Sequence, residues 1–349
     1  MGHWETFQPN QICAGTVMKA FVTGGGGFLG SAIVRQLVHK GVEVAVFGRN
    51  YYPHLEKLDV QQFQGNIGDS DILIRAMQGY DTVFHVAAKA GIWGAKYEFE
   101  QTNVVGTRNV LGACFASGVE TLVYTSTPSV VFDRSDLRGA DETTPYARRF
   151  LCYYASSKAV AEQMALAANS EVLKTCAIRP HLIWGPGDPH LIPRLVERGK
   201  RRQLKIIGNG SNLVDISYID NVAESHIMAA ENLNSSATAA GNAYFISQGE
   251  PVNLWNWINE LFARLGIEPV TNKIGFGSAY ALGTLLEGIH MWFNLDKEPK
   301  MTRFLAEQLA KSHWFSIDNA RRDLGYAPRI STSAGLERVT HWLSATQKK

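Results

Sequence analysis

A run of glycines near the start of the chain constrains the fold more than any other feature. It follows Lys19–Thr23, a short run with β propensity, and precedes residues 31–40, in which apolar residues recur at helical spacing. Within it, Gly24, Gly27 and Gly30 have GxxGxxG spacing. Glycines in such a turn let the backbone approach a pyrophosphate, whose charge the N-terminal end of the following helix stabilises. The pattern predicts a dinucleotide-binding unit of strand, turn and helix.

Strand and helix patterns alternate along the first half of the chain. The predicted strands are 19–23, 42–47, 61–64, 82–86, 121–125 and 174–178, and the predicted helices are 31–40, 69–78, 102–117 and 154–169. Such alternation is typical of a mostly parallel sheet with helices on both faces. We therefore expect an α/β fold with a Rossmann-type doubly wound parallel sheet and a smaller C-terminal substrate-binding lobe.

The composition of the sequence changes after Pro180, where we expect loops rich in Gly, Pro and Trp between shorter helices. We expect an N-terminal extension over 1–17, a dinucleotide-binding Rossmann domain over 18–180, and a mainly substrate-binding lobe over 181–349. Part of 215–248 is expected to return to the Rossmann sheet. The length of 349 residues accommodates about two such units.

Composition and charge exclude several classes of function. The chain has 34 Lys and Arg against 32 Asp and Glu, so its formal charge of +2 is too balanced for dependence on nucleic acid. Its 4 cysteines are widely spaced, which predicts no disulfide framework, no metal site and a reducing cytoplasm. The first residues lack a basic region followed by an apolar one, so no secretory signal is predicted.

The end of the second predicted strand bears on the choice of cofactor. An NAD-binding site usually places an acidic residue there, on the adenosine ribose hydroxyls. This chain has Arg49 and no acid in the segment from Val46 to Asn50. A guanidinium matches the geometry of a phosphate, so Arg49 predicts recognition of the 2′-phosphate of NADP(H). A solvated arginine beside a site that accepts NAD is the alternative.

A second motif, Tyr154-Ala-Ser-Ser-Lys158, lies on the predicted helix 154–169. At a spacing of four residues the phenol and the ammonium share one face of a helix. A free phenol is a poor acid–base catalyst at neutral pH because its pKa is about 10, and a neighbouring ammonium lowers that pKa. Tyr153 is the alternative, but Ser157, four residues after it, supplies no charge. We therefore predict that Tyr154 and Lys158 are catalytic.

These motifs occur in the order that is typical of the extended short-chain dehydrogenase/reductases, and the chain resembles that family from Met18 to about Leu343. The resemblance rests on the glycine loop, His85-Val-Ala-Ala88, Asn103-Val-Val-Gly-Thr107, Thr125-Ser-Thr127, the Tyr154 motif, Arg179-Pro180, Trp184-Gly-Pro-Gly-Asp188 and Tyr218-Ile-Asp-Asn-Val222. It implies an enzyme that transfers hydride between a nicotinamide and a carbonyl carbon. It also implies a homodimer formed through the helices at 102–117 and 154–169.

Within that family the chain resembles the 3β-hydroxysteroid dehydrogenase-like branch, through Arg179–Asp188 and Phe315–Gly325. More narrowly, Ala88–Gly94, Tyr124–Val130 and Gly208–Asp215 are similar to bacterial 2-alkyl-3-oxoalkanoate reductases of long-chain olefin biosynthesis. That likeness implies reduction of a lipid-like β-keto acid and partner enzymes of a hydrocarbon pathway. A 3β-hydroxysteroid or sterol dehydrogenase with the same catalytic residues is the main alternative. A nucleotide-sugar epimerase and a non-catalytic NADP sensor are less favoured.

The resemblance assigns roles to the catalytic residues. Thr127 would orient the carbonyl oxygen, although serine is the usual occupant and Ser126 and Ser129 remain candidates if the register shifts. Tyr154 would donate the proton. Lys158 would lower the pKa of Tyr154 and hold the nicotinamide ribose.

The resemblance also implies the binding residues. The cofactor would contact Gly24, Gly27, Phe28, Leu29, Gly30, Arg49, Asn66, Ile67, Ala87, Asn103, Tyr154, Lys158 and Pro180, and Asn103 could also support a proton relay through water. Trp93, His181 and Trp184 follow strands whose carboxyl ends form the ligand crevice of open α/β sheets. They are candidates for the substrate pocket, with ordinary packing as the alternative.

An apolar stripe between Ala281 and Asn294 consists of Leu282, Leu285, Leu286, Ile289, Trp292 and Phe293. The most common use of such a stripe is packing on the core of its own lobe. The functional alternative is a lid or a membrane-facing element beside a lipid channel, which leaves peripheral membrane association open. Glu287 and His290 make the surrounding apolar stretch a poor transmembrane helix.

Overall fold

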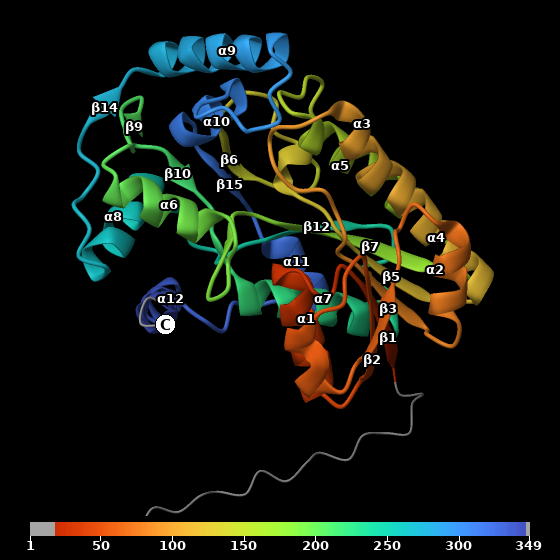
Figure 1. Ribbon diagram of the computed structural model, residues 1–349. Coiled ribbons are helices and arrows are strands. Elements are labelled where there is room, and N and C mark those ends of the chain that lie inside the picture. Colours follow the sequence, from red (N-terminus) through yellow and green to blue (C-terminus); the bar gives the residue numbers. More distant parts are fainter. Residues whose placement is uncertain (1–17, 347–349) are drawn as a thin grey trace, which may run out of the picture.

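Parallel strands form the central sheet of the structure, a computed structural model that describes residues 18–346. The extension expected over 1–17 lies outside these residues. Seven strands pair in the order β12-β7-β5-β4-β1-β2-β3 (Figure 1). They are β1 (Lys19–Thr23), β2 (Glu43–Gly48), β3 (Gln61–Gln64), β4 (Thr82–His85), β5 (Thr121–Thr125), β7 (Lys174–Pro180) and β12 (Ala243–Ile246). The predicted α/β class with a Rossmann-type sheet is confirmed.

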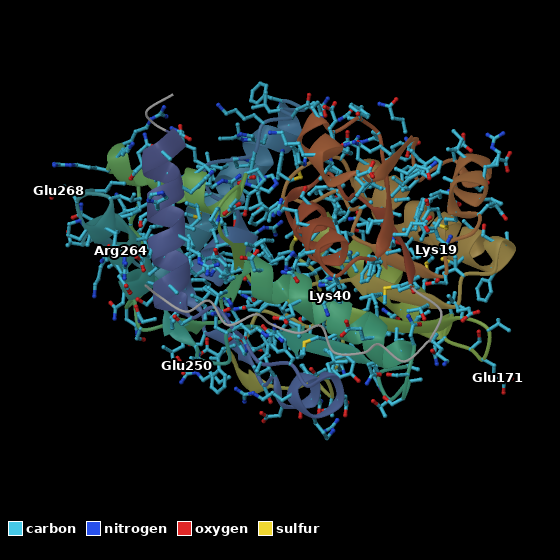
Figure 2. The ribbon with its side chains drawn as sticks, turned by 90° about the horizontal axis from the view of Figure 1, so that it is seen from below. Lys19, Lys40, Glu171, Glu250, Arg264 and Glu268 are labelled. Atoms are coloured by element: carbon cyan, nitrogen blue, oxygen red, sulfur yellow. The ribbon has the colours of Figure 1, made fainter. Side chains whose placement is uncertain are left out.

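Helices cover both faces of this sheet because successive strand residues point to opposite sides. Val22 of β1 packs in a cluster with α1 (Phe28–His39) and α7 (Ile219–Leu233). Its neighbour Phe21 belongs to a second cluster, with α2 (Ser70–Met77), α4 (Gly106–Ser117) and α5 (Tyr153–Ala167). Lys40, which follows α1 and is labelled in Figure 2, forms an ion pair with Glu231 of α7 at 2.7 Å.

The strand order reverses beside β1, and this reversal positions the site. The chain moves from β1 to β2 and β3 on one side, then crosses over to β4 and β5 on the other. The carboxyl ends of β1 and β4 are therefore followed by loops that diverge and leave a crevice between them. The glycine loop follows β1, and the segment from Val86 to Trp93 follows β4.

The C-terminal half adds a second layer of small sheets and helices. A four-stranded sheet contains, in order, β13 (Val252–Asn253), β10 (Leu213–Val214), β15 (His313–Phe315) and β6 (Leu137–Ala140). The paired short strands are β8 (Ile183–Trp184) with β11 (Ser217–Tyr218), and β9 (Ile206–Ile207) with β14 (Lys273–Ile274). The α-helices are α6 (Leu191–Lys200), α8 (Leu254–Arg264), α9 (Phe276–Trp292), α10 (Arg303–Ala310), α11 (Asp318–Leu324) and α12 (Thr332–Thr346).

Short helical turns complete the chain. They are η1 (Pro53–Leu58), α3 (Lys96–Phe99), the π-helical η2 (Glu100–Val105) and η3 (Pro128–Val130). Figure 1 shows α9 at the top of the molecule, over α10 and apart from the central sheet. Among the described residues, none of the helices has the length and apolar character required to cross a bilayer.

Candidate active site

The glycine turn closes tightly between β1 and α1. Gly24 has a φ of +70°, and a Cβ at this position would lie 2.8 Å from the backbone of Ala87. The Gly27 amide donates to the Gly24 carbonyl oxygen at 2.9 Å, and a Cβ on Gly30 would lie 2.2 Å from that same oxygen. Side chains at Gly24 and Gly30 are therefore excluded by contacts with backbone. The turn has the form of a cradle that a Cβ would fill.

The start of α1 supplies the hydrogen-bond donors that a pyrophosphate needs. Gly27 is the N-cap residue, and no side chain caps the helix. The N–H groups of Phe28, Leu29 and Gly30, in the first turn, have no acceptor within the helix. Together with the partial positive charge of a helix N-terminus, they suit a phosphate group. The turn therefore fits the pyrophosphate of a dinucleotide.

The structure brings the other predicted cofactor residues to the same edge of the sheet. Arg49 follows β2, Asn66 and Ile67 follow β3, Ala87 follows β4, and Pro180 is the last residue of β7. The Arg49 side chain is exposed and, within residues 18–346, makes no ion pair. Its guanidinium is free to bind an external anion.

Sequence reasoning missed two residues beside the glycine turn. The Tyr52 ring lies against Gly26, where a Cβ would be 2.2 Å from the ring. His54 Nε2 lies 3.2 Å from Ser31 Oγ in α1. Both residues belong to the turn after β2 that leads through η1. No periodicity marks this segment, so only the tertiary contacts show that it lies beside the glycine turn.

Tyr154 and Thr127 meet at the start of α5. Tyr154 is in the first turn of the helix and is partly buried. Burial raises the pKa of Tyr154 to about 12, and a hydrogen bond with the Thr127 side chain acts in the opposite direction. The Thr127 hydroxyl also accepts from the Ser129 amide and donates to the Ser129 hydroxyl, both at 3.3 Å. Ser126 is buried and its hydroxyl has no partner in the structure, so Thr127 is the hydroxyl that the fold places beside the phenol.

Lys158 lies one turn further along α5 and is buried. Its Nζ donates to the Thr125 carbonyl oxygen at 2.5 Å and lies 4.1 Å from the centre of the Tyr124 ring. Burial lowers the pKa of Lys158 to about 7, and the negative charge of Glu162 opposes that shift. Lys158 was expected to lower the pKa of Tyr154. In the structure, burial has the largest effect on the pKa of Tyr154 and raises it, whereas the hydrogen bond with Thr127 lowers it.

A buried ion pair lies behind Lys158. Glu162, fully buried, accepts from Arg179 Nε at 2.9 Å and from Nη2 at 2.5 Å, and Tyr146 donates to it at 2.6 Å. The motif Tyr154–Lys158 thus continues along one helix face to Glu162, at a further spacing of four residues. Sequence reasoning missed this carboxylate, although the spacing was visible.

Asn103 fastens the loop after β4 to α5. Its side chain accepts from the Lys89 amide at 2.8 Å, and donates to the Lys89 carbonyl at 3.1 Å and to Ser157 Oγ at 2.9 Å. Both of its N–H donors are therefore used by protein atoms. The π-helical turn η2 contains Asn103 and brings it to this position. The Asn103 side chain thus joins the loop after β4 to α5, and its predicted support of a water relay stays a prediction.

Tyr154 belongs to a small apolar cluster. The cluster also contains Ile92, Leu151 and, from α10, Phe304. These side chains come from the loop after β4, the segment before α5 and the C-terminal half of the chain, so the cluster joins three parts of the fold at Tyr154. Phe304 had no signal in the sequence. Apolar walls of this kind favour a substrate with alkyl or ring carbon around the reacting carbonyl.

Two of the three predicted pocket residues are placed elsewhere. Trp184 is fully buried and packs edge-on against Tyr218 and Trp257, so it is part of the hydrophobic core. His181 is buried, and its ring nitrogens lie 3.0 Å from the Asp215 carbonyl oxygen and from His313 Nδ1. These two assignments are corrected, because packing and hydrogen bonds within the protein already occupy both side chains.

Trp93 is partly buried in the loop after β4, and its assignment to the substrate pocket stays a prediction. Its indole N–H donates to the Leu295 carbonyl oxygen at 3.1 Å, and its ring meets His290 edge-on. The loop after β4 is thereby joined to the C-terminal end of α9.

Across residues 18–346, no group of three or more His, Cys, Asp or Glu side chains is arranged to hold a metal ion.

Residues 21–274 match the 3-beta hydroxysteroid dehydrogenase/isomerase family. The chain belongs to this family. It is 48% identical over 325 residues to a 2-alkyl-3-oxoalkanoate reductase of Stenotrophomonas maltophilia, with 92% of this chain and 98% of that protein covered. A protein of the same name from Shewanella oneidensis is also 48% identical, with 93% and 86% covered. The mouse sterol-4-alpha-carboxylate 3-dehydrogenase, decarboxylating, is 34% identical, with 92% and 90% covered.

Solved structures agree with this assignment. The chain superposes on MoeE5 in complex with UDP-glucose and NAD with a TM-score of 0.73 at 25% identity, covering 94% of this chain and 99% of that one. The structure of gox2253 gives a TM-score of 0.77 at 28% identity, with 94% and 98% covered. The protein is therefore an oxidoreductase of the nicotinamide-dependent dehydrogenase and reductase type.

Proposed function

We propose that the protein reduces the ketone of a 2-alkyl-3-oxoalkanoate to the 2-alkyl-3-hydroxyalkanoate, with NADPH as the reductant. The observation that carries the proposal is the meeting of the Thr127 hydroxyl and the Tyr154 phenol within an apolar cluster, at the sheet edge that also holds the glycine turn. The 48% identity to two proteins named for this reaction supports the substrate class.

The residues of the site fit the cofactor. The glycine turn and the start of α1 would hold the pyrophosphate, and Arg49 would bind a 2′-phosphate at the end of β2. When bound, the nicotinamide supplies the hydride that reduces the carbonyl carbon. The exposure of Arg49 and its lack of an ion pair among the described residues support NADP(H) over NAD(H).

The catalytic side chains manage the charge that develops on the carbonyl oxygen. Thr127 donates a hydrogen bond to this oxygen, in place of the 3.3 Å bond that it donates to Ser129, and fixes the position of the oxygen. Tyr154, whose pKa is raised to about 12, is protonated at neutral pH and gives its proton to the developing alkoxide. The Lys158 ammonium then stabilises the phenolate that remains. NADPH, a proton and the keto acid thus give NADP⁺ and the hydroxy acid.

A sterol or 3β-hydroxysteroid dehydrogenase is the second candidate. The apolar cluster around Tyr154 would accept ring carbon as well as alkyl chains, and a mammalian sterol dehydrogenase is 34% identical to this chain. The same Thr127, Tyr154 and Lys158 would serve the oxidation of a ring hydroxyl.

The remaining parts of the proposal concern the surroundings of the enzyme. We place it in a reducing cytoplasm, because the described cysteines are free and buried. A homodimer through α4 and α5 is supported by exposed apolar side chains on both helices, Phe115 and Val160. The product would carry alkyl chains on both C2 and C3, so it would be a suitable substrate for partner enzymes that make hydrocarbons.

The experiment that tests the proposal is a turnover assay with a panel of long-chain 2-alkyl-3-hydroxy acids, 3β-hydroxysteroids and UDP-sugars, each with NADP⁺ and NAD⁺. Hydroxy acids are used because β-keto acids decarboxylate readily. We expect turnover of the hydroxy acids with NADP⁺, and a loss of at least about 10²-fold in Tyr154→Phe. Tyr153→Phe is the matched control, since Tyr153 is exposed next to the catalytic residue.

Each outcome decides between named alternatives. Turnover of steroids alone would promote the sterol dehydrogenase. Cofactor binding without turnover of any substrate by the wild type would favour a nucleotide sensor, and equal losses in Tyr153→Phe and Tyr154→Phe would remove Tyr154 from the mechanism.

A further inference from the structure

A hollow in the surface carries more cations than acids. It has a volume of about 540 Å³, and it is lined by charged side chains and one aromatic ring: Asp133, Arg134, Arg148, Arg149, Phe276, Glu307 and Lys311. Four of these side chains are cationic and two are acidic. This excess of positive charge favours an anionic ligand.

Glu307 holds two of the four cations. Its side chain is buried, and its carboxylate pairs with Arg134 at 3.5 Å and with Lys311 at 2.7 Å. Arg134 also donates to the Tyr280 hydroxyl at 3.0 Å, and Lys311 Nζ donates to the Arg134 carbonyl oxygen. Contacts within the protein therefore fix both of these cations.

Arg148 and Arg149 are the other two cations, and both side chains are exposed. Within residues 18–346 neither guanidinium forms an ion pair or a hydrogen bond. Asp133, the acid of the hollow that Glu307 leaves unexplained, forms no ion pair there either. A guanidinium presents its N–H donors in one plane and binds a carboxylate through two parallel hydrogen bonds. These two arginines are therefore available to a ligand that carries a carboxylate.

Two elements that line the hollow also contribute to the apolar cluster of Tyr154. On the segment before α5, Arg149 is followed directly by Phe150, which packs against that cluster. On α10, Phe304 belongs to the cluster, and Glu307, three residues later on the same helix, lines the hollow. The hollow therefore adjoins the part of the fold that holds the proposed proton donor.

Helix α9 begins at the hollow with Phe276 and lies over α10 (Figure 1). It packs there through small and polar residues, since a Cβ on Gly283 would lie 2.7 Å from the Thr302 backbone and Glu287 accepts from Arg303 Nε at 2.6 Å. The apolar stripe seen in the sequence does not pack on the core of its lobe, and most of its residues are exposed: Leu282, Leu285, Ile289, Trp292 and Phe293. The contacts of α9 thus hold α10 in place and occupy Arg303.

The other cations on the elements that form the Tyr154 cluster already have partners within residues 18–346. Lys89, in the loop after β4, pairs with a glutamate of α3 at 2.9 Å. Lys158 is buried and donates to a backbone carbonyl oxygen at 2.5 Å, and Arg303 pairs with the buried carboxylate of α9 at 2.6 Å. Arg148 and Arg149 are thus the cations of these elements that remain free for a substrate.

We propose that the hollow is a carboxylate-binding subsite, in which Arg148 and Arg149 hold the carboxylate of the acid whose ketone is reduced at Tyr154. The identity of that acid rests on the proposed function. In a 2-alkyl-3-oxoalkanoate the carboxylate is bonded to the carbon beside the ketone, so a cation that binds it has to come from an element that also reaches Tyr154. Arg148 and Arg149 meet this condition. The subsite makes the enzyme specific for acids and holds the ketone in front of the phenol.

Isothermal titration calorimetry of the full chain with NADP⁺ tests the subsite. One probe is a 2-alkyl carboxylic acid of medium chain length without the 3-hydroxyl group, which binds but cannot react. The other is its primary amide, which has the same carbon skeleton and no charge. Arg148→Gln combined with Arg149→Gln should weaken binding of the acid by about 10–100-fold and leave binding of the amide nearly unchanged. The matched control, Arg75→Gln with Arg108→Gln, removes two exposed arginines from α2 and α4 and should bind both probes like the wild type.

Asp133→Asn should change the affinity in the opposite direction. It removes the unpaired negative charge of the hollow, so the acid should bind about two- to fivefold more tightly while the amide is unaffected. A folding defect does not produce such a gain. Binding of the acid to the wild type should also weaken as the salt concentration rises, and the variant without Arg148 and Arg149 should lose most of this dependence.

Three results would overturn the proposal. The wild type binds the acid no more tightly than the amide; the double arginine variant binds the acid as tightly as the wild type; or that variant loses the acid and the amide equally, which would indicate general damage to the pocket. Turnover of a 2-alkyl-3-hydroxy acid is measured in parallel. If no form turns it over while the acid still binds through the two arginines, the proposed function fails and the subsite stands.

Discussion

The buried ion pair between Glu162 and Arg179 predicts how much the free energy of unfolding falls when its charge is removed. Arg179 and Glu162 are each almost fully buried, two hydrogen bonds from Arg179 Nε and Nη2 join them, and Arg179 Nη1 has no hydrogen-bond partner. Glu162→Gln keeps the shape of the side chain and removes its charge. It leaves the Arg179 guanidinium charged and buried without the carboxylate to which it is hydrogen-bonded, which costs about 3–5 kcal/mol of the free energy of unfolding.

Calorimetry or a dye-based thermal scan at neutral pH measures this loss. For a chain of this length, unfolding entropy of about 2.1 cal/mol/K per residue converts it into a Tm lower by about 4–7 °C. Glu197→Gln is the matched control, because Glu197 pairs with Arg201 at 3.0 Å on the surface, where both side chains are about 60% exposed. It should change the free energy of unfolding by less than about 0.5 kcal/mol.

A double variant separates the charge from the contacts. Glu162→Leu with Arg179→Met removes both charges and should recover most of the stability that Glu162→Gln loses, since neither ion is left unpaired. The reasoning is refuted if Glu162→Gln costs no more than the surface control. It is also refuted if the double variant is less stable than Glu162→Gln.

Two further predictions concern charged side chains at the site. Lys158→Met should raise Tm at pH 6, because the pKa of Lys158 in the folded state, about 7, lies below its unfolded value of 10.5. The gain in Tm should shrink as the pH rises from about 7 to 10.5. A variant that is less stable than the wild type at pH 6 would contradict this prediction. Arg49→Ala should weaken NADPH by roughly 10–100-fold, the worth of a charge-assisted hydrogen bond, and leave NADH nearly unchanged, as measured by fluorescence titration. Equal losses for both cofactors would exclude Arg49 from phosphate recognition.

The parts of the fold that depend on local pattern were predictable from the sequence. The strand from Lys19 to Thr23, the glycine turn and the helix after it are neighbours in the chain, and β propensity, glycine spacing and helical periodicity identify them directly. Tyr154 and Lys158 were predictable for the same reason, since their spacing on one helix fixes their relation. These local features account for the large sheet and for the core of the site.

Features that depend on contacts between distant segments were not predictable. Phe304 joins the cluster of Tyr154 because α10, 150 residues further along the chain, returns to the site. Trp184 looked like a pocket residue because it follows a sheet strand, but the buried side chains of Tyr218 and Trp257 enclose it. The stripe on α9 had a visible period, yet the period alone does not say which side of a helix faces the protein.

The pH dependence of the proposed reduction separates the two titrating groups of the proposed catalytic pair, Tyr154 and Lys158. Tyr154, with a pKa of about 12, stays protonated across the practical range, so loss of the acid cannot limit the reaction below pH 10. Lys158, with a pKa of about 7, loses the charge that stabilises the phenolate just above neutrality. We therefore expect kcat/KM for reduction to be constant below about pH 7 and to fall above it. Glu162 raises the pKa of Lys158, so Glu162→Gln should move this fall to lower pH, while Glu197→Gln should leave it in place. A profile that stays flat to pH 10 in the wild type, or one that Glu162→Gln does not move, would show that the Lys158 charge does not support the proton transfer.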